Sequence, residues 1–141
     1  MQNKLIPVLL DDVATWLNPK IGEAYFDGTA GYGGHAQAII ARIGPAGRAV
    51  LVDRDRNAIK ALGERFDQKA EIIHATFTEA AEDLLEDGSL FDLMLLDLGV
   101  SSPQFDNGER GFSFREDAAL DMRMDQSKQL TAADVVNKYS L

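Results

Sequence analysis

The sequence predicts an α/β fold, in which helices cover both faces of a doubly wound, parallel sheet. Over the first 98 residues, apolar runs of strand length alternate with amphipathic segments of helix length, which is the order that such a sheet requires. The runs 48–53 and 91–98 are almost continuously apolar, as expected of strands that are covered on both faces. A glycine-rich turn over residues 27–35 joins the first strand to the next helix.

The element boundaries follow from turn and cap residues. Asn18-Pro19 stops the first helix, and Asp55 is placed to cap the third. We expect the strands in the order 3-2-1-4, which leaves the fourth, apolar strand at an open edge; further strands of a longer protein are therefore expected. The expected strands are 24–26, 48–53, 71–75 and 91–98, and the expected helices are 8–17, 35–43, 56–66 and 78–86.

The alternation stops after Gly99. Residues 99–128 are rich in Gly, Ser, Pro, Asp and Arg without a regular period, and we interpret them as a long functional loop. Thr131 and Asp134 have the spacing of a capping box, which predicts a helix that begins near residue 132.

The composition, with 45% hydrophobic and 26% charged residues, is that of a globular protein. No apolar run approaches the roughly 20 residues of a membrane-spanning helix, and Asp11 interrupts the short apolar stretch after Lys4, so no signal peptide is predicted. The absence of cysteine excludes disulfides and thiolate metal sites and fits a cytoplasmic location. A formal net charge of −9 argues against a general basic face for nucleic acid, so an RNA substrate would need a local patch.

The glycine turn predicts a ligand site at the end of the first strand. Glycines let the backbone approach a ligand closely, and the following helix presents free N–H groups and the positive end of its dipole. Such a turn binds either a pyrophosphate or the amino-acid part of S-adenosylmethionine. The dinucleotide fingerprint would use Gly31 and Gly33 but meets Ala36 at its third glycine. A tight turn without a ligand is the other possibility.

Four side chains are candidates for the same crevice. Asp53 ends the second strand, about 20 residues past the glycines, where a carboxylate can accept hydrogen bonds from both ribose hydroxyls. Asp97 ends the fourth strand, and the carboxyl ends of parallel strands share one edge. Phe77, after the third strand, packs either on an adenine face or in the core. His35 either offers a donor to a ligand carboxylate or simply occupies the first helical turn.

A short polar loop over residues 99–105 follows the fourth strand. Such a loop suits methyl transfer to an exocyclic base amine. The lone pair of this amine is delocalised into the ring, so the enzyme must hold the N–H and align the nitrogen with the methyl donor. At this point the chain resembles the bacterial 16S ribosomal RNA cytosine-N4 methyltransferase family, from about residue 6 to 140. The segments that carry the resemblance are 6–11 (IPVLLD), 27–35 (DGTAGYGGH), 97–104 (DLGVSSPQ), 109–114 (ERGFSF) and 120–125 (LDMRMD).

The resemblance implies an S-adenosylmethionine-dependent enzyme with a Rossmann-like, class I methyltransferase domain and an inserted helical domain that recognises the substrate. Residues 1–128 would then be part of the cofactor domain, truncated after about four strands, and residues 129–141 the start of the helical domain. The substrate would be a cytosine in the decoding region of the small ribosomal subunit, extruded from its RNA structure. The implied cofactor contacts are Gly33, Gly34, His35, Asp53, Phe77, Asp97 and Gln104, and the residues expected to position the amine are Asp97, Ser101, Ser102 and Pro103.

The chain departs from the family pattern at three places. Leu5 stands where the family usually has a histidine, which weakens any role for that position. Tyr32 replaces the commoner arginine and is expected to point outward, and Ala118-Ala119 replaces Gly-Pro.

Several alternatives stay open at this point. A nicotinamide-dependent oxidoreductase uses the same kind of turn, and the chain could also be a non-catalytic cofactor-binding fragment, inactive alone or pairing as a homodimer through its fourth strand. Arg110, Arg115 and Arg123 form either a local basic edge for RNA or a salt-bridged loop, since acidic residues interleave with them. His74 is expected to be structural, and no residue spacing predicts a metal site.

Overall fold

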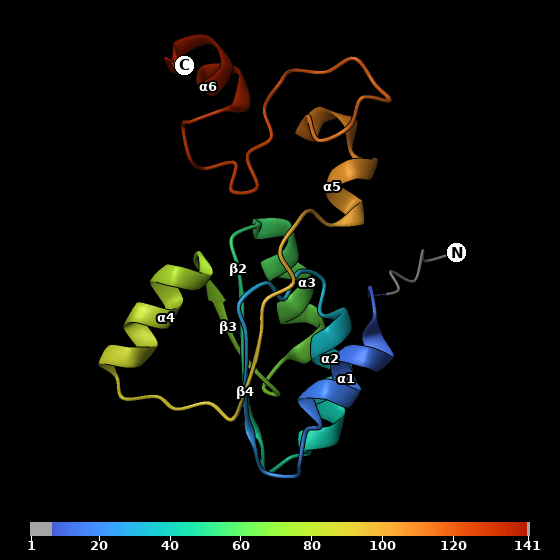
Figure 1. Ribbon diagram of the computed structural model, residues 1–141, viewed down its shortest axis with the longest axis vertical. Helices are drawn as coiled ribbons and strands as arrows, with labels where there is room; N and C mark the ends of the chain where they lie inside the picture. Colours follow the sequence, from blue (N-terminus) through green and yellow to red (C-terminus); the bar gives the residue numbers. More distant parts are fainter. Residues whose placement is uncertain (1–6, 141) are drawn as a thin grey trace. The chain divides into compact units, whose positions relative to one another are not determined.

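The computed structural model describes residues 7–140, which form two compact units (Figure 1). The first unit extends to Leu98, and the second begins at Gly99. Leu5 lies outside the described residues. Within residues 7–140, no helix combines the length and apolarity that a membrane crossing requires.

The first unit is built on a parallel sheet of four strands in the order β3-β2-β1-β4, which confirms the predicted order. Asp27 at the end of β1 pairs with Leu95 at the end of β4, so these two strands end level with each other. Asp27 also pairs with Leu51, and β2 continues for two residues beyond it to Asp53. The strands are β1 (Ala24–Asp27), β2 (Arg48–Asp53), β3 (Glu71–His74) and β4 (Leu93–Leu95).

Helices cover both faces of this sheet, as a doubly wound fold requires. Figure 1 shows α1 to α3 on one side of the sheet and α4 on the other. Side chains alternate between the two faces along β1, so Tyr25 belongs to the core cluster under α1 to α3 and Phe26 to the cluster under α4. The helices are α1 (Leu10–Leu17), α2 (Gly34–Ile43), α3 (Arg56–Phe66) and α4 (Phe77–Glu86).

Side-chain caps start two of these helices. The Asp55 carboxylate accepts the Asn57 N–H at 2.9 Å, which confirms the predicted cap of α3. Thr76 and Glu79 form a capping box at the start of α4, one residue earlier than the sequence pattern predicts.

The strand β4 is shorter than the predicted run 91–98 and covers only Leu93–Leu95. At its start the Asp92 carboxylate, rather than a backbone carbonyl, accepts the Ala24 N–H at 2.8 Å. At its end the Leu95 carbonyl accepts the Gly28 N–H at 3.0 Å, and β1 then turns away. The length of β4 is therefore set by the residues of β1 with which it can pair, although its apolar run is longer.

The second unit contains short helices within residues 99–128. The prediction of one long loop over this segment missed them. Ser101 and Gln104 form a capping box, with Pro103 in the first turn, and this pattern was readable in the sequence. The predicted box at Thr131 and Asp134 is confirmed. The elements are α5 (Ser102–Asp106), a 3-10 helix η1 (Gly108–Arg110) and α6 (Ala132–Lys138).

Candidate cofactor site

The turn after β1 is closed by backbone hydrogen bonds. The Ala30 N–H donates to the Val52 carbonyl at 2.9 Å, and the Gly33 N–H donates to the Ala30 carbonyl at 2.8 Å. Gly31 and Gly33 have φ angles of +54° and +78°, a region that glycine adopts with little strain. Tyr32, between them, is half-buried.

The glycines of this turn differ in what surrounds them. A Cβ on Gly31 would meet a single backbone oxygen 3.9 Å away, so this residue faces open space. A Cβ on Gly33 would overlap with the Phe66 ring, and a Cβ on Gly34 would overlap with Pro7. The structure therefore leaves room for close approach of a ligand at Gly31, whereas side-chain packing alone already requires glycine at Gly33 and Gly34.

Asp53, at the end of β2, is oriented by the glycine turn. One carboxylate oxygen, Oδ2, accepts the Gly31 N–H at 2.8 Å, and the other, Oδ1, accepts the Asp55 N–H at 2.8 Å. Since a carboxylate has about four acceptor positions, each oxygen keeps a second lone pair. This arrangement is suited to accepting two further hydrogen bonds from a vicinal diol.

A buried polar pair, Tyr25 and Asp27, lies beneath the turn, and the sequence interpretation missed it. The Tyr25 hydroxyl donates to Asp27 Oδ2 at 2.7 Å, and the Thr29 N–H donates to Asp27 Oδ1 at 3.2 Å. Tyr25 and Asp27 are 0% and 1% exposed. The available signal was two polar side chains spaced two residues apart in a buried strand, which places them on the same face.

Burial dominates the electrostatics of this pair. It raises the pKa of Asp27 to about 6, against the lowering effect of the hydrogen bonds from Tyr25 and Thr29 and of the neighbouring His35. Burial, and then the nearby carboxylate, also raise the pKa of Tyr25, so its hydroxyl stays a proton donor. The pair thus holds the first residues of the turn from inside the protein.

Thr29 connects this buried pair to Asp97. Its hydroxyl oxygen accepts the Asp97 N–H at 2.7 Å, while its own N–H donates to Asp27. The backbone that follows β4 is therefore attached to the glycine turn of β1. This attachment brings Asp97 to the turn, as the sequence predicts for the carboxyl edge of a parallel sheet.

His35 faces Asp97 with its second ring nitrogen. Its Nε2 lies 2.9 Å from the Val8 carbonyl oxygen, which can only accept, so Nε2 carries the hydrogen. Nδ1 lies 3.9 Å from Asp97 Oδ2. In the neutral ring Nδ1 is an acceptor, and it becomes the donor that the sequence interpretation expected only when the ring is protonated.

Phe77, at the start of α4, also reaches the end of β1. Its side chain is 38% exposed and belongs to neither core cluster. A Cβ on Gly28 would lie 2.8 Å from the Phe77 Cβ, so Gly28 leaves the space that lets the aromatic residue lie against the turn.

The structure brings six of the predicted site residues together at the carboxyl edge of the first unit, around the glycine turn: Gly33, Gly34, His35, Asp53, Phe77 and Asp97. The other predicted residues, Ser101, Ser102, Pro103 and Gln104, begin α5 in the second unit. There the Gln104 side-chain oxygen accepts the Ser101 N–H at 3.0 Å, and Gln104 is 5% exposed.

Two further expectations concern metal ligands and His74. Among residues 7–140, no group of three or more His, Cys, Asp or Glu side chains is arranged to hold a metal ion. His74 Nε2 lies 3.1 Å from the Arg54 carbonyl oxygen at the exposed end of β3. This contact gives His74 a local structural partner in the backbone that follows β2.

The fold is that of known methyltransferases. The chain is similar to the C-terminal domain of precorrin-6Y C5,15-methyltransferase from Rhodobacter capsulatus, with a TM-score of 0.55 and 20% identity over 70% of this chain and 52% of that one. It is also similar to a protein-L-isoaspartate O-methyltransferase (0.52; 16%; 67% and 30%) and to an S-adenosylmethionine-dependent O-methyltransferase from Thermotoga maritima (0.50; 16%; 56% and 32%). The chain thus spans about half or less of these structures.

The fold is therefore the Rossmann-like, class I methyltransferase fold that the sequence predicts. The chain belongs to the MraW methylase family, whose model matches residues 2–141. This is a family of S-adenosylmethionine-dependent ribosomal RNA methyltransferases, as the sequence resemblance predicts. Membership favours S-adenosylmethionine over the nicotinamide cofactor that the glycine turn alone left open.

Proposed function

We propose that the protein represented by this chain transfers a methyl group from S-adenosylmethionine to the N4 atom of a cytosine in the decoding region of 16S ribosomal RNA. The observation that carries this proposal is the match to the MraW methylase family over residues 2–141. The proposed setting is the cytoplasm. In the proposed organisation, residues 1–128 belong to the cofactor domain and residues 129–141 begin a helical domain that recognises the substrate.

The residues around the glycine turn fit the proposed cofactor. The turn at Gly31 to Gly34 would hold the amino-acid part, with open space at Gly31 for close approach. Asp53 would accept hydrogen bonds from the ribose hydroxyls through its remaining lone pairs, and Phe77 would lie against the adenine. When bound, the cofactor supplies an electrophilic methyl group on a positively charged sulfur.

The amine would be positioned by Asp97 or by the residues that begin α5, namely Ser101, Ser102 and Pro103. Asp97 would accept one N–H of the cytosine amine, which orients the nitrogen toward the methyl group. The nitrogen would accept the methyl group, with the cofactor sulfur as the leaving group. Its surplus proton would pass to solvent after the transfer, so a strong general base is not required.

Calorimetry with two ligands tests the cofactor part of the proposal. We expect this chain to bind S-adenosylmethionine and to show no heat with NADH. Binding of NADH without binding of S-adenosylmethionine would instead support an oxidoreductase and contradict the proposal.

A methylation assay on small ribosomal subunits tests the reaction. We expect the full-length protein to incorporate one methyl group at N4 of a cytosine, and this chain alone to incorporate none. Incorporation by this chain would show that the cofactor domain suffices, whereas incorporation by neither protein would contradict the proposed substrate.

A further inference from the structure

A closed loop in the second unit connects η1 to the segment that precedes α6. The two ends of this loop, at Gly111 and Ala119, touch: a Cβ on Gly111 would lie 2.6 Å from the Ala119 carbonyl oxygen, and Gly111 has a φ of +73°. The Met122 N–H donates to the Arg110 carbonyl at 3.0 Å and closes the base. The loop therefore projects from a fixed neck.

Two arginines form hydrogen bonds at this neck. Neither of them forms the basic edge for RNA that was one alternative in the sequence analysis. The Arg110 side chain is buried, and its Nη2 donates to the carbonyls of Arg123 and Met124 at 3.2 and 2.9 Å. Arg123 donates to both carboxylate oxygens of Asp121, at 2.9 and 2.6 Å. For Arg123 the structure supports the salt-bridged loop, Arg110 binds backbone carbonyls of the same segment, and Arg115 lies elsewhere.

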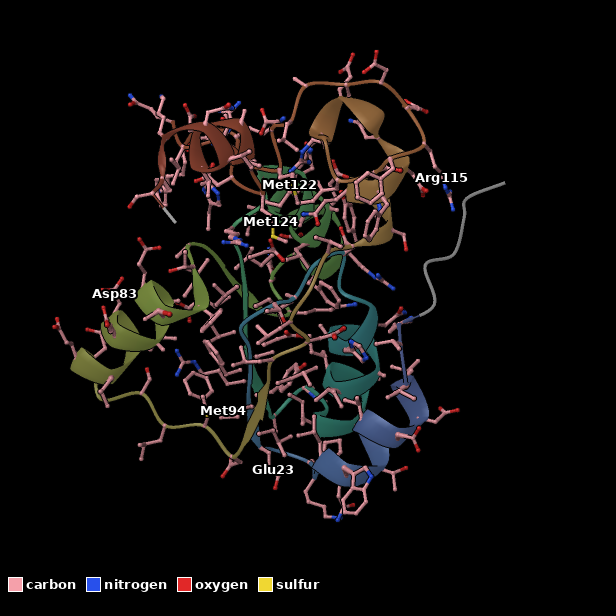
Figure 2. All side chains as sticks on the ribbon, turned by 45° about the horizontal axis from the view of Figure 1, so that its top comes forward. Glu23, Asp83, Met94, Arg115, Met122 and Met124 are labelled. Carbon is pink, nitrogen blue, oxygen red and sulfur yellow. The ribbon has the colours of Figure 1, made fainter. Side chains whose placement is uncertain are left out.

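The tip of the loop presents an aromatic ring and a cation to solvent. The relative exposure of Phe114 is 108%, the highest of the large hydrophobic residues in the described part of the chain. Arg115 follows it, with its backbone N–H held by the Ser113 hydroxyl at 3.2 Å, and its side chain extends away from the ribbon (Figure 2). The Glu116 carboxylate turns back toward Gly108 at the neck.

We propose that Phe114 and Arg115 form a contact for single-stranded RNA, in which the Phe114 ring stacks on an unpaired base and Arg115 binds a neighbouring phosphate. Aromatic rings beside arginine are the usual means of holding unstacked bases. A protein interface would require a contiguous apolar patch, whereas the residues on either side of Phe114 are polar. A local contact of this kind suits a chain with a net charge of −9.

This inference rests on the proposed RNA substrate and adds residues to it. Because Asp117 is also exposed near Arg115, we expect stacking rather than charge to supply most of the affinity of this contact. Arg115 should account for about one phosphate in the salt dependence of binding.

The test measures binding of a fluorescent hexacytidine RNA to the full-length protein at several salt concentrations. We expect Phe114→Leu to weaken binding about 5- to 150-fold, and Phe114→Trp to restore it, because any aromatic ring can stack. Arg115→Gln should lower the slope of log affinity against log salt by about 0.7. The matched control, Trp16→Leu, replaces an exposed ring on α1, outside the proposed RNA and cofactor contacts, and should leave RNA affinity unchanged.

Calorimetry with S-adenosylmethionine separates the possible failures. If Phe114→Leu binds both the cofactor and the RNA like the unmodified protein, the Phe114 contact is wrong and the proposed function stands. If Phe114→Leu binds hexacytidine normally but the small ribosomal subunit more weakly, Phe114 contacts a protein and the inference is also wrong. If the unmodified protein binds neither S-adenosylmethionine nor small subunits, the proposed function itself fails.

Discussion

Asp27 shows how a single buried carboxylate can support a ligand site that it does not itself line. It receives hydrogen bonds from Tyr25 and Thr29, and through Thr29 it is linked to the backbone at Asp97. The exposed lone pairs that would meet a ligand belong to Asp53 instead. In the proposed site, the carboxylate at the end of β1 would support the turn and the carboxylate at the end of β2 would bind the ligand.

The raised pKa of Asp27 gives a prediction about stability and pH. Its pKa is about 6 in the folded chain against 3.8 in the unfolded chain, so the folded state binds the proton more tightly. The stability from this group is complete below pH 3.8 and is lost as the pH rises through 6. Between pH 5 and 7.5 the loss should be about 1 to 1.5 kcal/mol, and Asp27→Asn should lack it.

Urea denaturation of both proteins across this pH range measures the difference. Tyr25→Phe is a useful companion, because it removes a hydrogen bond that lowers the Asp27 pKa and should make the loss steeper. A difference between the unmodified chain and Asp27→Asn that stays constant from pH 4.5 to 7.5 would contradict the prediction.

Asp53 is predicted to act in cofactor binding. Asp53→Ala removes the acceptor for the Gly31 N–H as well as the proposed ribose contacts, so affinity for S-adenosylmethionine should fall at least about 10-fold. Asp53→Asn keeps one acceptor oxygen and should lose less. Calorimetry gives the affinities, and circular dichroism checks that both variants stay folded; equal affinity for all three proteins would exclude Asp53 from the site.

The role of a residue was predictable where its position in a helix or strand calls for that residue type. Asp55 as a helix cap and Asp53 at a strand end follow from position alone. The role of Asp27 was readable only in part: its spacing from Tyr25 places both on one face of β1, whereas its link to the Asp97 backbone exists only after β1 and β4 pair. Contacts of this kind depend on the folded sheet rather than on spacing along the chain.

At the scale of elements, the glycines of the turn differ in what a side chain would meet: open space at Gly31 and a packed ring at Gly33. Gly31→Ala introduces a Cβ into open space at φ +54°, which should cost about 1 to 2 kcal/mol of stability. Gly33→Ala also forces a Cβ into the buried Phe66 ring and should cost about 1 to 3 kcal/mol more. Thermal unfolding ranks the two variants, and an equal loss of stability in both would show that Phe66 can move aside.

The elements themselves were largely predictable, because turn residues and apolar runs set them locally. The bounds of β2 agree with the sequence pattern residue by residue, since glycines precede it and Asp53 ends it. β4 was predicted too long because its neighbour β1 ends first. The helices α5 and η1 were missed because short helices carry little periodicity, although Ser101 and Gln104 offered a capping signal.

At the scale of the molecule, β4 is an edge of the described sheet. Met94 on this strand, labelled in Figure 2, is one of its exposed apolar residues. Its exposed fraction is 60%, and that of Leu96, beyond the strand, is 48%. An apolar edge strand promotes pairing with another chain. We therefore predict that this chain associates with itself as its concentration rises, and that Met94→Lys weakens the association several-fold.

Sedimentation velocity over a range of concentrations tests this prediction. Leu85→Lys makes the same change of an exposed apolar residue to lysine, on α4 rather than on β4, and serves as a control for net charge. A monomer at all concentrations, or equal association of both variants, would contradict a role for the β4 edge. The order of the strands was predictable from the alternation of elements, whereas the strength of such pairing was not.

The contact between Gly33 and the Phe66 ring has a consequence for how the family can vary. Because the ring occupies the space where a Cβ would stand, the two positions share one volume. A larger residue at position 33 should be accepted only together with a smaller residue at position 66, even though 33 residues separate them along the chain. Across related sequences these positions should therefore covary, and in the laboratory Phe66→Leu should recover part of the stability that Gly33→Ala loses.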